Sequence, residues 1–305
     1  MKKKIVLAGG TGFIGRGIIR HFGQADYEYV ILTRSPKQRT DGVKEVHWDA
    51  KNLGPWTLEL ENAEALINLT GKSVNCRYTE KNKAEILTSR IYSTGILGTA
   101  ILQLQQPPKV WINSSSATIY RHAEDRNMDE LTGEFGNDFS PGVVKAWEKS
   151  FNEINTPNTA KFALRISIVL GDGDGVMPRL INLVRFGLGG KQGNGAQFFS
   201  WLHEEDLYRI IAWCIANPAE QGVYNCCVPN PITNHYLMSC LRQAMHMPFG
   251  LPATRWMLKF GAVLIGTDAE LVLKSRRVIP TKLIQKGFTF TYPEINSALK
   301  NLLSA

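Results

Sequence analysis

Short apolar runs alternate with longer amphipathic stretches over most of the chain. The first run, Lys2–Leu7, ends in apolar residues and predicts a short buried strand, while Phe13–Phe22 repeats its apolar residues at helical spacing. The same alternation predicts strands at 29–33, 43–49, 65–69, 110–120, 161–171 and around Val223, and helices at 80–105, 138–154 and 204–217. Strands that alternate with helices in this way predict an α/β fold with a doubly wound parallel sheet of the Rossmann type.

Two stretches interrupt this alternation. They are residues 172–200, which include the glycine-rich segment Gly187–Gly195, and residues 229–305. We interpret both as additions at the carboxyl edge of the sheet, where a substrate lid is built. We therefore predict a Rossmann domain from residues 1–170 and 204–228, and a smaller substrate-side lid and C-terminal domain from residues 171–203 and 229–305. Lys191 in the glycine-rich segment either contacts a substrate phosphate or lies in a mobile lid without ligand contacts.

The first strand and the first helix are joined by a turn with three spaced glycines. Strand, glycine turn and helix together are the context in which such glycines indicate a dinucleotide pyrophosphate site. Gly9 permits a sharp turn, Gly12 lets backbone N–H groups approach the phosphates, and Gly15 allows close packing of the helix. The helix N-terminus adds unsatisfied N–H groups and a positive dipole end. We predict that this turn binds the cofactor through Gly9, Thr11, Gly12, Phe13, Ile14 and Gly15.

The end of the second predicted strand indicates which dinucleotide is bound. NAD-binding folds place an Asp or Glu about 20 residues after the glycines, where it accepts from the ribose 2′-hydroxyl. Here that place holds Thr33 and Arg34, followed by Ser35 and Lys37. A guanidinium binds a 2′-phosphate that a carboxylate would repel, so we predict NADP(H) in preference to NAD(H). The alternative is that Arg34 and Lys37 belong to an ordinary solvated loop.

Other candidate residues follow the later strands, because ligands of a doubly wound sheet lie at the carboxyl ends of its strands. Asp49 is predicted near the adenine. Arg90, in the middle of an apolar helix, is predicted as a cofactor contact directed at the cleft. The alternatives are a surface cation and a buried partner in a structural ion pair. The remaining predicted cofactor contacts, near the ribose and at the end of the strand that begins at Val110, are Leu69, Thr70, Gly71 and Ser114.

Composition and charge exclude several other classes of protein. The 305 residues are 44% hydrophobic and 20% charged, as in a soluble globular protein, and no apolar run reaches the length of a membrane span. The charged N-terminus does not resemble a signal peptide, so we expect a cytoplasmic protein without a membrane partner. The five cysteines lack metal-like spacing, which favours reduced, structural thiols and no metal site. The net charge of +8 is scattered, which suits anionic small molecules better than nucleic acid.

Two motifs carry a resemblance to a known family. Gly9–Gly15 is similar to the cofactor turn, and Ser114–Tyr120 to the fifth-strand motif, of UDP-galactose 4-epimerase and other extended short-chain dehydrogenases/reductases. More specifically, the chain resembles the branch described as epimerase family proteins, predicted nucleoside-diphosphate-sugar epimerases. Further matching segments, spread over nearly the whole chain, are 68–71, 89–91, 147–148, 165–171, 187–190, 200–206, 276–280 and 287–293.

This resemblance implies roles for particular residues. Ser116 falls on the catalytic serine, which helps to hold the reacting oxygen of the substrate, but the catalytic Tyr-x-x-x-Lys does not carry over. Counted back from Trp147, the tyrosine falls at about Ser140 and the lysine at about Val144. Tyr120, just after the serine strand, is predicted as a second catalytic residue. The other replacement proton donors are Tyr78, His203 and a water held by Ser140.

Two functions remain open at this point. The first is an NADP(H)-dependent oxidoreductase or epimerase with an atypical acid/base, acting on a sugar nucleotide or a small carbonyl or alcohol. The second is a catalytically degenerate NADP(H)-binding sensor or regulatory protein.

His203 and Asp206 resemble a family His-x-x-Asp at a helix start, for which a structural role is favoured. Family members often pair through the two long helices beside the fourth and fifth strands, so a homodimer is one option.

Overall fold

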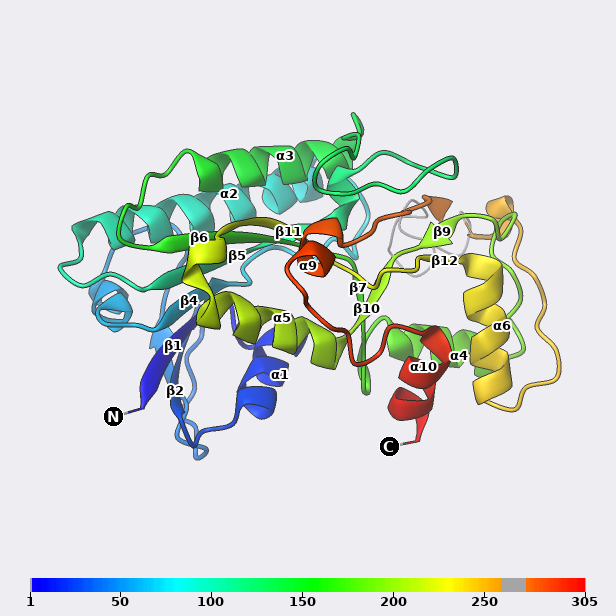
Figure 1. The fold of residues 1–305 in the computed structure, drawn as a ribbon, viewed down its shortest axis with the longest axis horizontal. Helices are drawn as coiled ribbons and strands as arrows, with labels where there is room; N and C mark the ends of the chain where they lie inside the picture. Colours follow the sequence, from blue (N-terminus) through cyan, green and yellow to red (C-terminus); the bar gives the residue numbers. More distant parts are fainter. Residues whose placement is uncertain (1, 259–272, 305) are drawn as a thin grey trace.

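The computed structural model describes residues 2–258 and 273–304. Its centre is a sheet of seven parallel strands in the order β11-β6-β5-β4-β1-β2-β3 (Figure 1). This order reverses at β1, which confirms the predicted doubly wound Rossmann fold. In chain order the strands are β1 (Lys3–Ala8), β2 (Tyr27–Thr33), β3 (Lys44–His47), β4 (Ala65–Asn68), β5 (Val110–Ser116), β6 (Ala160–Ile166) and β11 (Gly222–Cys226).

Helices cover both faces of this sheet. On one face lie α2 (Glu80–Gln103) and α3 (Phe139–Asn152), and on the other α1 (Phe13–Phe22) and α5 (Glu204–Ala216) (Figure 1). Successive residues of β1 point to opposite faces, so Ile5 and Leu7 join one apolar cluster and Val6 and Ala8 the other. The strands are therefore buried on both sides, which accounts for their continuous apolar runs.

The rest of the chain builds a smaller part at the carboxyl end of the sheet. It contains a three-stranded sheet, in the order β10-β7-β8, and the two-stranded pair β12-β9. The division of the chain into two domains remains a prediction. The elements of this part are β7 (Ile168–Gly171), β8 (Asp174–Gly175), α4 (Met177–Arg185), β9 (Phe198–Phe199), β10 (Trp201–His203), β12 (Ile232–Thr233), α6 (Asn234–Ala244), α9 (Thr281–Gln285) and α10 (Ile295–Leu303). The described residues also include three short 3₁₀ helices: η1 (Pro55–Leu60), η2 (Ala117–Ile119) and η3 (Pro218–Glu220).

Two predicted strands have the wrong ends. The single strand expected at 161–171 is divided at Ser167, whose backbone N–H and hydroxyl both donate to the Cys226 carbonyl at 3.0 and 2.8 Å. Beyond this point β7 leaves the central sheet and pairs with β10. The strand expected at 110–120 ends at Ser116, because the Ser116 hydroxyl accepts the N–H of Thr118 at 3.2 Å and starts η2.

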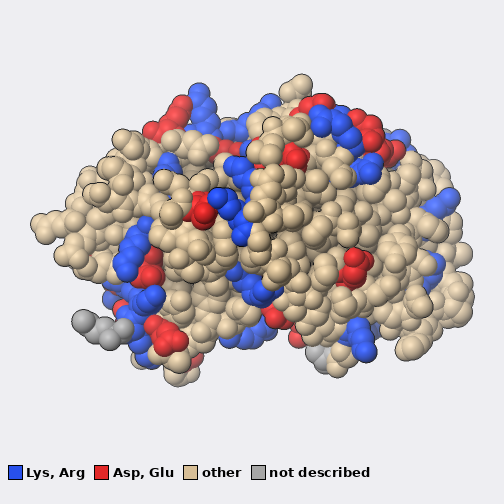
Figure 2. Space-filling view, in the orientation of Figure 1, with Lys and Arg blue, Asp and Glu red and all other residues tan. Residues whose placement is uncertain are grey.

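The described residues contain neither a helix long and apolar enough to cross a bilayer nor a cluster of metal-ligating side chains. All five cysteines are free, and Cys226 and Cys227 lie in different apolar clusters, as expected for neighbours on a strand. On the face in Figure 2, Lys and Arg are interspersed with Asp and Glu over much of the surface.

His203 and Asp206 attach the C-terminal segment to the start of α5. His203 is the N-cap residue of this helix: its Nδ1 accepts the N–H of Glu205 at 3.1 Å. Its Nε2 therefore carries the proton and lies 3.1 Å from Oδ1 of Asn301. The buried Asp206 carboxylate accepts the backbone N–H groups of Thr291 and Tyr292 at 2.7 and 2.9 Å. Both contacts are structural, as the sequence favoured.

The burial of His203 predicts a loss of stability in acid. Burial lowers the pKa of His203 in the folded protein, although Asp206, Glu204 and Glu205 oppose the shift. The unfolded state then binds more protons, so this contribution is complete above about pH 6.5 and is lost as the pH falls. We expect the His203→Asn variant, which retains a capping side chain, to have a flatter pH dependence of unfolding free energy in urea. The exposed His47→Asn is the control; identical profiles for wild type and His203→Asn would contradict this assignment.

Candidate functional site

The glycine turn between β1 and α1 is built as the sequence predicts. Gly9 has φ +75°, and a Cβ there would lie 2.9 Å from Oγ1 of Thr70. A Cβ on Gly15 would lie 2.1 Å from the Gly10 carbonyl oxygen, whereas one on Gly12 would meet nothing within 4 Å. The N-terminus of α1, with Gly12 as N-cap and no side chain capping it, therefore faces open space. This geometry suits a phosphate group.

The other predicted residues of the turn hold it in place. The exposed Thr11 accepts a hydrogen bond at its carbonyl from Arg16 at 2.8 Å, and Arg16 also pairs with Asp174 in β8. The Phe13 ring packs against Gly171, where a Cβ would lie 2.2 Å from the ring. Ile14 packs against the core cluster beneath α1. The cofactor contacts predicted for these residues remain predictions.

Arg34 at the end of β2 differs from its cationic neighbour Arg39. Arg39 pairs with Asp41 and, at 3.3 Å, with Glu45, so its charge is neutralised within the loop. Arg34 is exposed and has no ion pair among the described residues. The side-chain hydroxyls of Thr33 and Ser35 beside it are engaged in only one weak contact among the described residues, in which the Ser35 N–H lies 3.5 Å from Oγ1 of Thr33. The Arg34 guanidinium is thus available to an anionic ligand.

The two predicted contacts beyond β3 and β4 have different surroundings. The Asp49 carboxylate accepts the backbone N–H groups of Lys51 and Asn52, both at 2.9 Å, and these bonds lower its pKa to about 2. Asp49 thus shapes its own turn, and its contact with adenine remains a prediction. Thr70 is the reverse case: its N–H donates to Asn68 at 3.1 Å, but its buried hydroxyl has no hydrogen-bond partner among the described residues. An unsatisfied buried hydroxyl against the Gly9 turn fits a site whose ligand supplies the partner.

Arg90 is neither a surface cation nor half of an ion pair. Its guanidinium donates to the carbonyls of Lys72 and Ile86 at 3.1 and 2.9 Å and lies 5.1 Å from the ring centre of Trp147. A Cβ on Gly71 would lie 3.0 Å from it, and no carboxylate pairs with it in the described part of the chain. Burial lowers the pKa of Arg90 to about 10. A cation beside the end of β4 thus retains its charge at neutral pH.

A buried polar network that the sequence analysis missed fixes the ends of β4 and β5. Asn68 and Asn113 are register neighbours, and Nδ2 of Asn68 donates to Oδ1 of Asn113 at 2.7 Å. Thr94 on α2 lies 3.3 Å from both side chains and accepts from Nε1 of Trp147 at 2.9 Å. The available signal was an asparagine ending one apolar strand and another inside the next. This network positions the strand ends from which Thr70 and Ser114 emerge.

The three serines at the end of β5 point in alternate directions. Ser114 and Ser116 lie on one face and are partly exposed, whereas Ser115 is buried and donates to Glu148 at 2.6 Å. The hydroxyl of Ser116 also accepts from Oγ1 of Thr118 at 3.0 Å, which fixes its position. The predicted substrate contact of Ser116 is compatible with this exposure.

Tyr120, predicted as a catalytic residue, is fully buried. Its hydroxyl accepts from Arg165 at 2.8 Å and donates to Oδ1 of Asn225 at 3.0 Å. Arg165 in turn forms a bidentate ion pair with the buried Glu148, both bonds at 2.8 Å. Burial raises the pKa of Tyr120 to about 12. These contacts argue against proton transfer by Tyr120 and assign it to a buried network that joins β6, α3 and β11.

Other residue types occupy the positions of α3 at which the family resemblance places the Tyr-x-x-x-Lys motif. Val144 is buried in an apolar cluster with Ile119 and Tyr120, and the Lys145 amine points elsewhere, 3.5 Å from Asn137. Tyr78 packs edge-on against Phe139 at 5.1 Å between ring centres, so it lies beside Ser140 at the start of α3. Since His203 is a capping residue, Tyr78 and a water at Ser140 are the proton donors still compatible with the fold.

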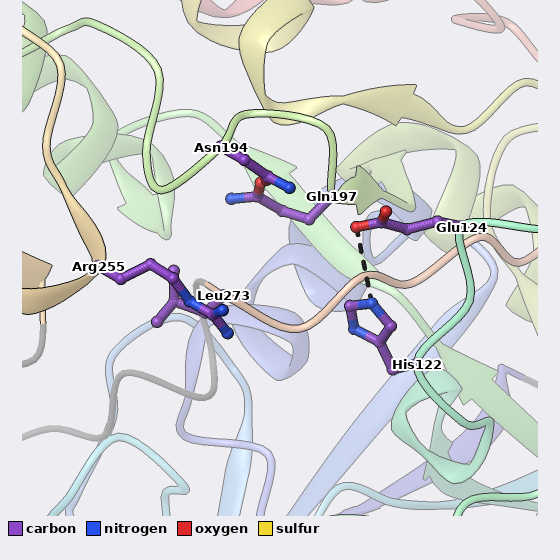
Figure 3. A pocket seen from close by; sticks show the side chains of 6 residues that line it. All are labelled: His122, Glu124, Asn194, Gln197, Arg255 and Leu273. Atoms are coloured by element: carbon purple, nitrogen blue, oxygen red, sulfur yellow. Dashed lines mark ion pairs between the residues drawn. The ribbon is translucent and has the colours of Figure 1, made fainter.

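A cavity of about 160 Å³ lies where four stretches of the chain meet, one from the loop after η2 and three from the smaller part of the molecule (Figure 3). Nδ1 of His122 accepts the Ser275 N–H at 3.0 Å, so the protonated Nε2 faces Glu124 at 3.6 Å. Asn194 brings the predicted glycine-rich lid to this cavity, while Lys191 is not among its lining residues. The lining offers hydrogen-bond donors and acceptors, one acidic side chain and one guanidinium. It consists of His122, Glu124, Asn194, Gln197, Arg255 and Leu273.

Comparison with known proteins agrees with this geometry. Residues 5–227 match the NAD dependent epimerase/dehydratase family, and residues 253–302 match a domain of unknown function. The Bacillus subtilis epimerase family protein YfhF is 30% identical over 301 residues, which are 98% of each chain.

Solved structures extend the similarity to three dimensions. The human epimerase family protein SDR39U1, solved with NADPH, has 28% identity and a TM-score of 0.87 over 99% of both chains. A nucleoside-diphosphate sugar epimerase from Corynebacterium glutamicum has 25% identity and a TM-score of 0.79 over 99% of this chain and 58% of that one. The chain therefore belongs to the NAD dependent epimerase/dehydratase family and has the NAD(P)-binding fold of its extended short-chain dehydrogenase/reductase members.

Proposed function

We propose that this protein binds NADP(H) and acts as an oxidoreductase or epimerase on a sugar nucleotide or a small carbonyl or alcohol. The observation that carries the cofactor assignment is the exposed guanidinium of Arg34, which has no ion pair in residues 2–258 and 273–304 and lies at the strand end next to the glycine turn. The human relative solved with NADPH supports this choice, and the C. glutamicum relative, named a nucleoside-diphosphate sugar epimerase, supports the substrate class.

Each part of the cofactor would meet a feature already described. The turn and the N-terminus of α1 would hold the pyrophosphate, and Arg34 with Thr33 and Ser35 the 2′-phosphate. The Thr70 hydroxyl would find its missing partner on a ribose. NADP(H) supplies or accepts the hydride in such a reaction. Ser116 would donate a hydrogen bond to the substrate oxygen at the end of β5.

Proton transfer must follow an atypical route, because a buried valine occupies the lysine position of α3. Tyr78 or a water at Ser140 would exchange the proton with the substrate oxygen. Arg90, a cation without a carboxylate partner beside the end of β4, would stabilise negative charge that develops there. We also propose a cytoplasmic location, and a homodimer through α2 and α3 as the family resemblance implies.

The same α3 positions favour a second candidate function. With Val144 in an apolar cluster and Tyr120 within a buried network, the protein retains the cofactor turn but lacks the family's acid/base pair. A catalytically degenerate NADP(H)-binding sensor would have these properties. It would bind NADPH tightly and turn over neither carbonyls nor nucleotide sugars, whereas an enzyme would turn over at least one of them.

We expect Arg34→Ala to weaken NADPH binding roughly 10- to 100-fold, the value of one or two charge-assisted hydrogen bonds. NADH binding should hardly change, because NADH lacks the 2′-phosphate. Nicotinamide fluorescence titrations measure both affinities. Arg39→Ala, which removes the paired cation of the same loop, is the matched control. Equal losses for NADPH and NADH, or an equal effect of Arg39→Ala, would refute the assignment.

For any substrate that is turned over, Ser116→Ala should lower kcat/KM by about 10²-fold while the Kd of NADPH stays unchanged. The neighbouring Ser115→Ala is a useful comparison, since its hydroxyl bonds to buried Glu148 and should affect stability rather than turnover. Undiminished turnover in Ser116→Ala would show that Ser116 is not catalytic.

A further inference from the structure

Four large apolar side chains are exposed on the smaller part of the molecule. Phe186 and Leu188 follow α4 and are 76% and 44% exposed, and Phe249 and Leu251, in the segment after α6, are 62% and 59% exposed. We call these four residues the apolar tip. Both segments lie at the end of the molecule opposite the N-terminus (Figure 1).

The apolar tip is held in a fixed shape by its backbone. The Leu251 N–H donates to the Gly187 carbonyl at 2.8 Å, and the Gly190 N–H donates to the Leu251 carbonyl at 3.1 Å. A Cβ on Gly190 would lie 2.5 Å from the Gly250 carbonyl oxygen, so the two segments touch through their main chains. The side chains therefore project from a connected, hydrogen-bonded base. Single exposed apolar residues are common on protein surfaces, but a group of four on one fixed base indicates an interaction site.

The surroundings of the apolar tip carry positive charge. The whole chain has 27 Asp and Glu residues, yet neither 175–203 nor 221–258 contains one. Arg185 and Lys191 flank the first half of the tip, are exposed, and form no ion pair within the described residues. Arg242 donates to the Gly189 carbonyl at 2.6 Å at the base of the tip. In Figure 2 the corresponding edge of the molecule shows Lys and Arg atoms and hardly any acidic ones.

The combination of exposed apolar side chains and neighbouring cations favours a lipid surface over a second copy of the chain as the binding partner. A symmetric contact with a second copy would bring Arg185 and Lys191 of both molecules together, and neither 175–203 nor 221–258 supplies a carboxylate to neutralise them. Projecting aromatic and aliphatic side chains rimmed by Arg and Lys are instead typical of segments that lie in a membrane interface. The cations complement the negative surface potential of anionic lipids.

We propose that the apolar tip docks this protein on the surface of an anionic lipid bilayer. Phe186 and Phe249 enter the headgroup region, while Arg185 and Lys191 approach lipid phosphates. The contact is peripheral and requires no membrane span, and it revises the sequence-based expectation of no membrane partner. It does not depend on the proposed cofactor or reaction.

Co-sedimentation with vesicles tests this docking on the full chain. The wild type should bind vesicles of phosphatidylcholine mixed with phosphatidylglycerol, and far less those of phosphatidylcholine alone. Binding should fall about tenfold in the double variant Phe186→Ser, Phe249→Ser, and about as much in ~0.5 M salt. Leu58→Ser on η1, which removes a side chain that is 72% exposed far along the sequence from the tip, is the matched control and should bind like wild type.

The midpoint of thermal unfolding, followed by far-UV circular dichroism, reports whether the double variant has folded, and it should lie within a few degrees of the wild-type midpoint. Failure of the wild type to bind anionic vesicles at low salt would overturn the proposal, as would equal binding by the double variant. A dimer in sedimentation velocity that is lost in the double variant would instead assign the tip to a second copy.

Discussion

Helix α1 lies so close to the turn before it that a Cβ on Gly15 would be 2.1 Å from the Gly10 carbonyl oxygen. A second contact fixes the same helix from the other side: a Cβ on Gly17 would lie 1.7 Å from the Tyr208 hydroxyl on α5. Together they set the N-terminus of α1 beyond the end of β1, in front of the open space at Gly12 and next to the strand end that carries Arg34. The placement of every proposed cofactor contact depends on this approach of backbone to backbone.

Buried polar contacts determine which side chains near the ends of β4 and β5 are available to a substrate. The ion pair between Glu148 and Arg165 is strongly desolvated, and two hydrogen bonds of 2.8 Å, one to each carboxylate oxygen, offset the cost of burying both charges. It engages the Tyr120 hydroxyl and keeps that group from a substrate. Arg90, by contrast, is half-buried, has no carboxylate partner among the described residues and keeps its charge beside the end of β4. The proposed site thus combines a cofactor half that follows the family pattern with a reaction half that departs from it.

Structural elements that depend on residues close together in the chain could be predicted from the sequence. Strand ends and buried side chains that depend on distant residues could not. Alternating periods and spaced glycines sufficed for the sheet, for α1 and for the turn, since each depends on local backbone geometry. The division of the strand at Ser167 depends on the Cys226 carbonyl, and the burial of Tyr120 on Arg165 and Asn225, which are 45 and 105 residues away. Periodicity carries no information about such partners. The absence of a lysine at Val144 could be recognised in the sequence, because residues four apart in a helix lie about one turn apart and the motif fixes that spacing.

The preference for NADP(H) depends on Arg34, which lies beside the glycine turn and has no ion pair within the described part of the chain. Calorimetric titration of the wild type with adenosine 2′,5′-bisphosphate and with AMP tests it most directly, because the two ligands differ only in the 2′-phosphate. The structure predicts that the bisphosphate binds at least about tenfold more tightly, and that the difference shrinks as salt screens the contact. Equal affinities for the two ligands would contradict the account.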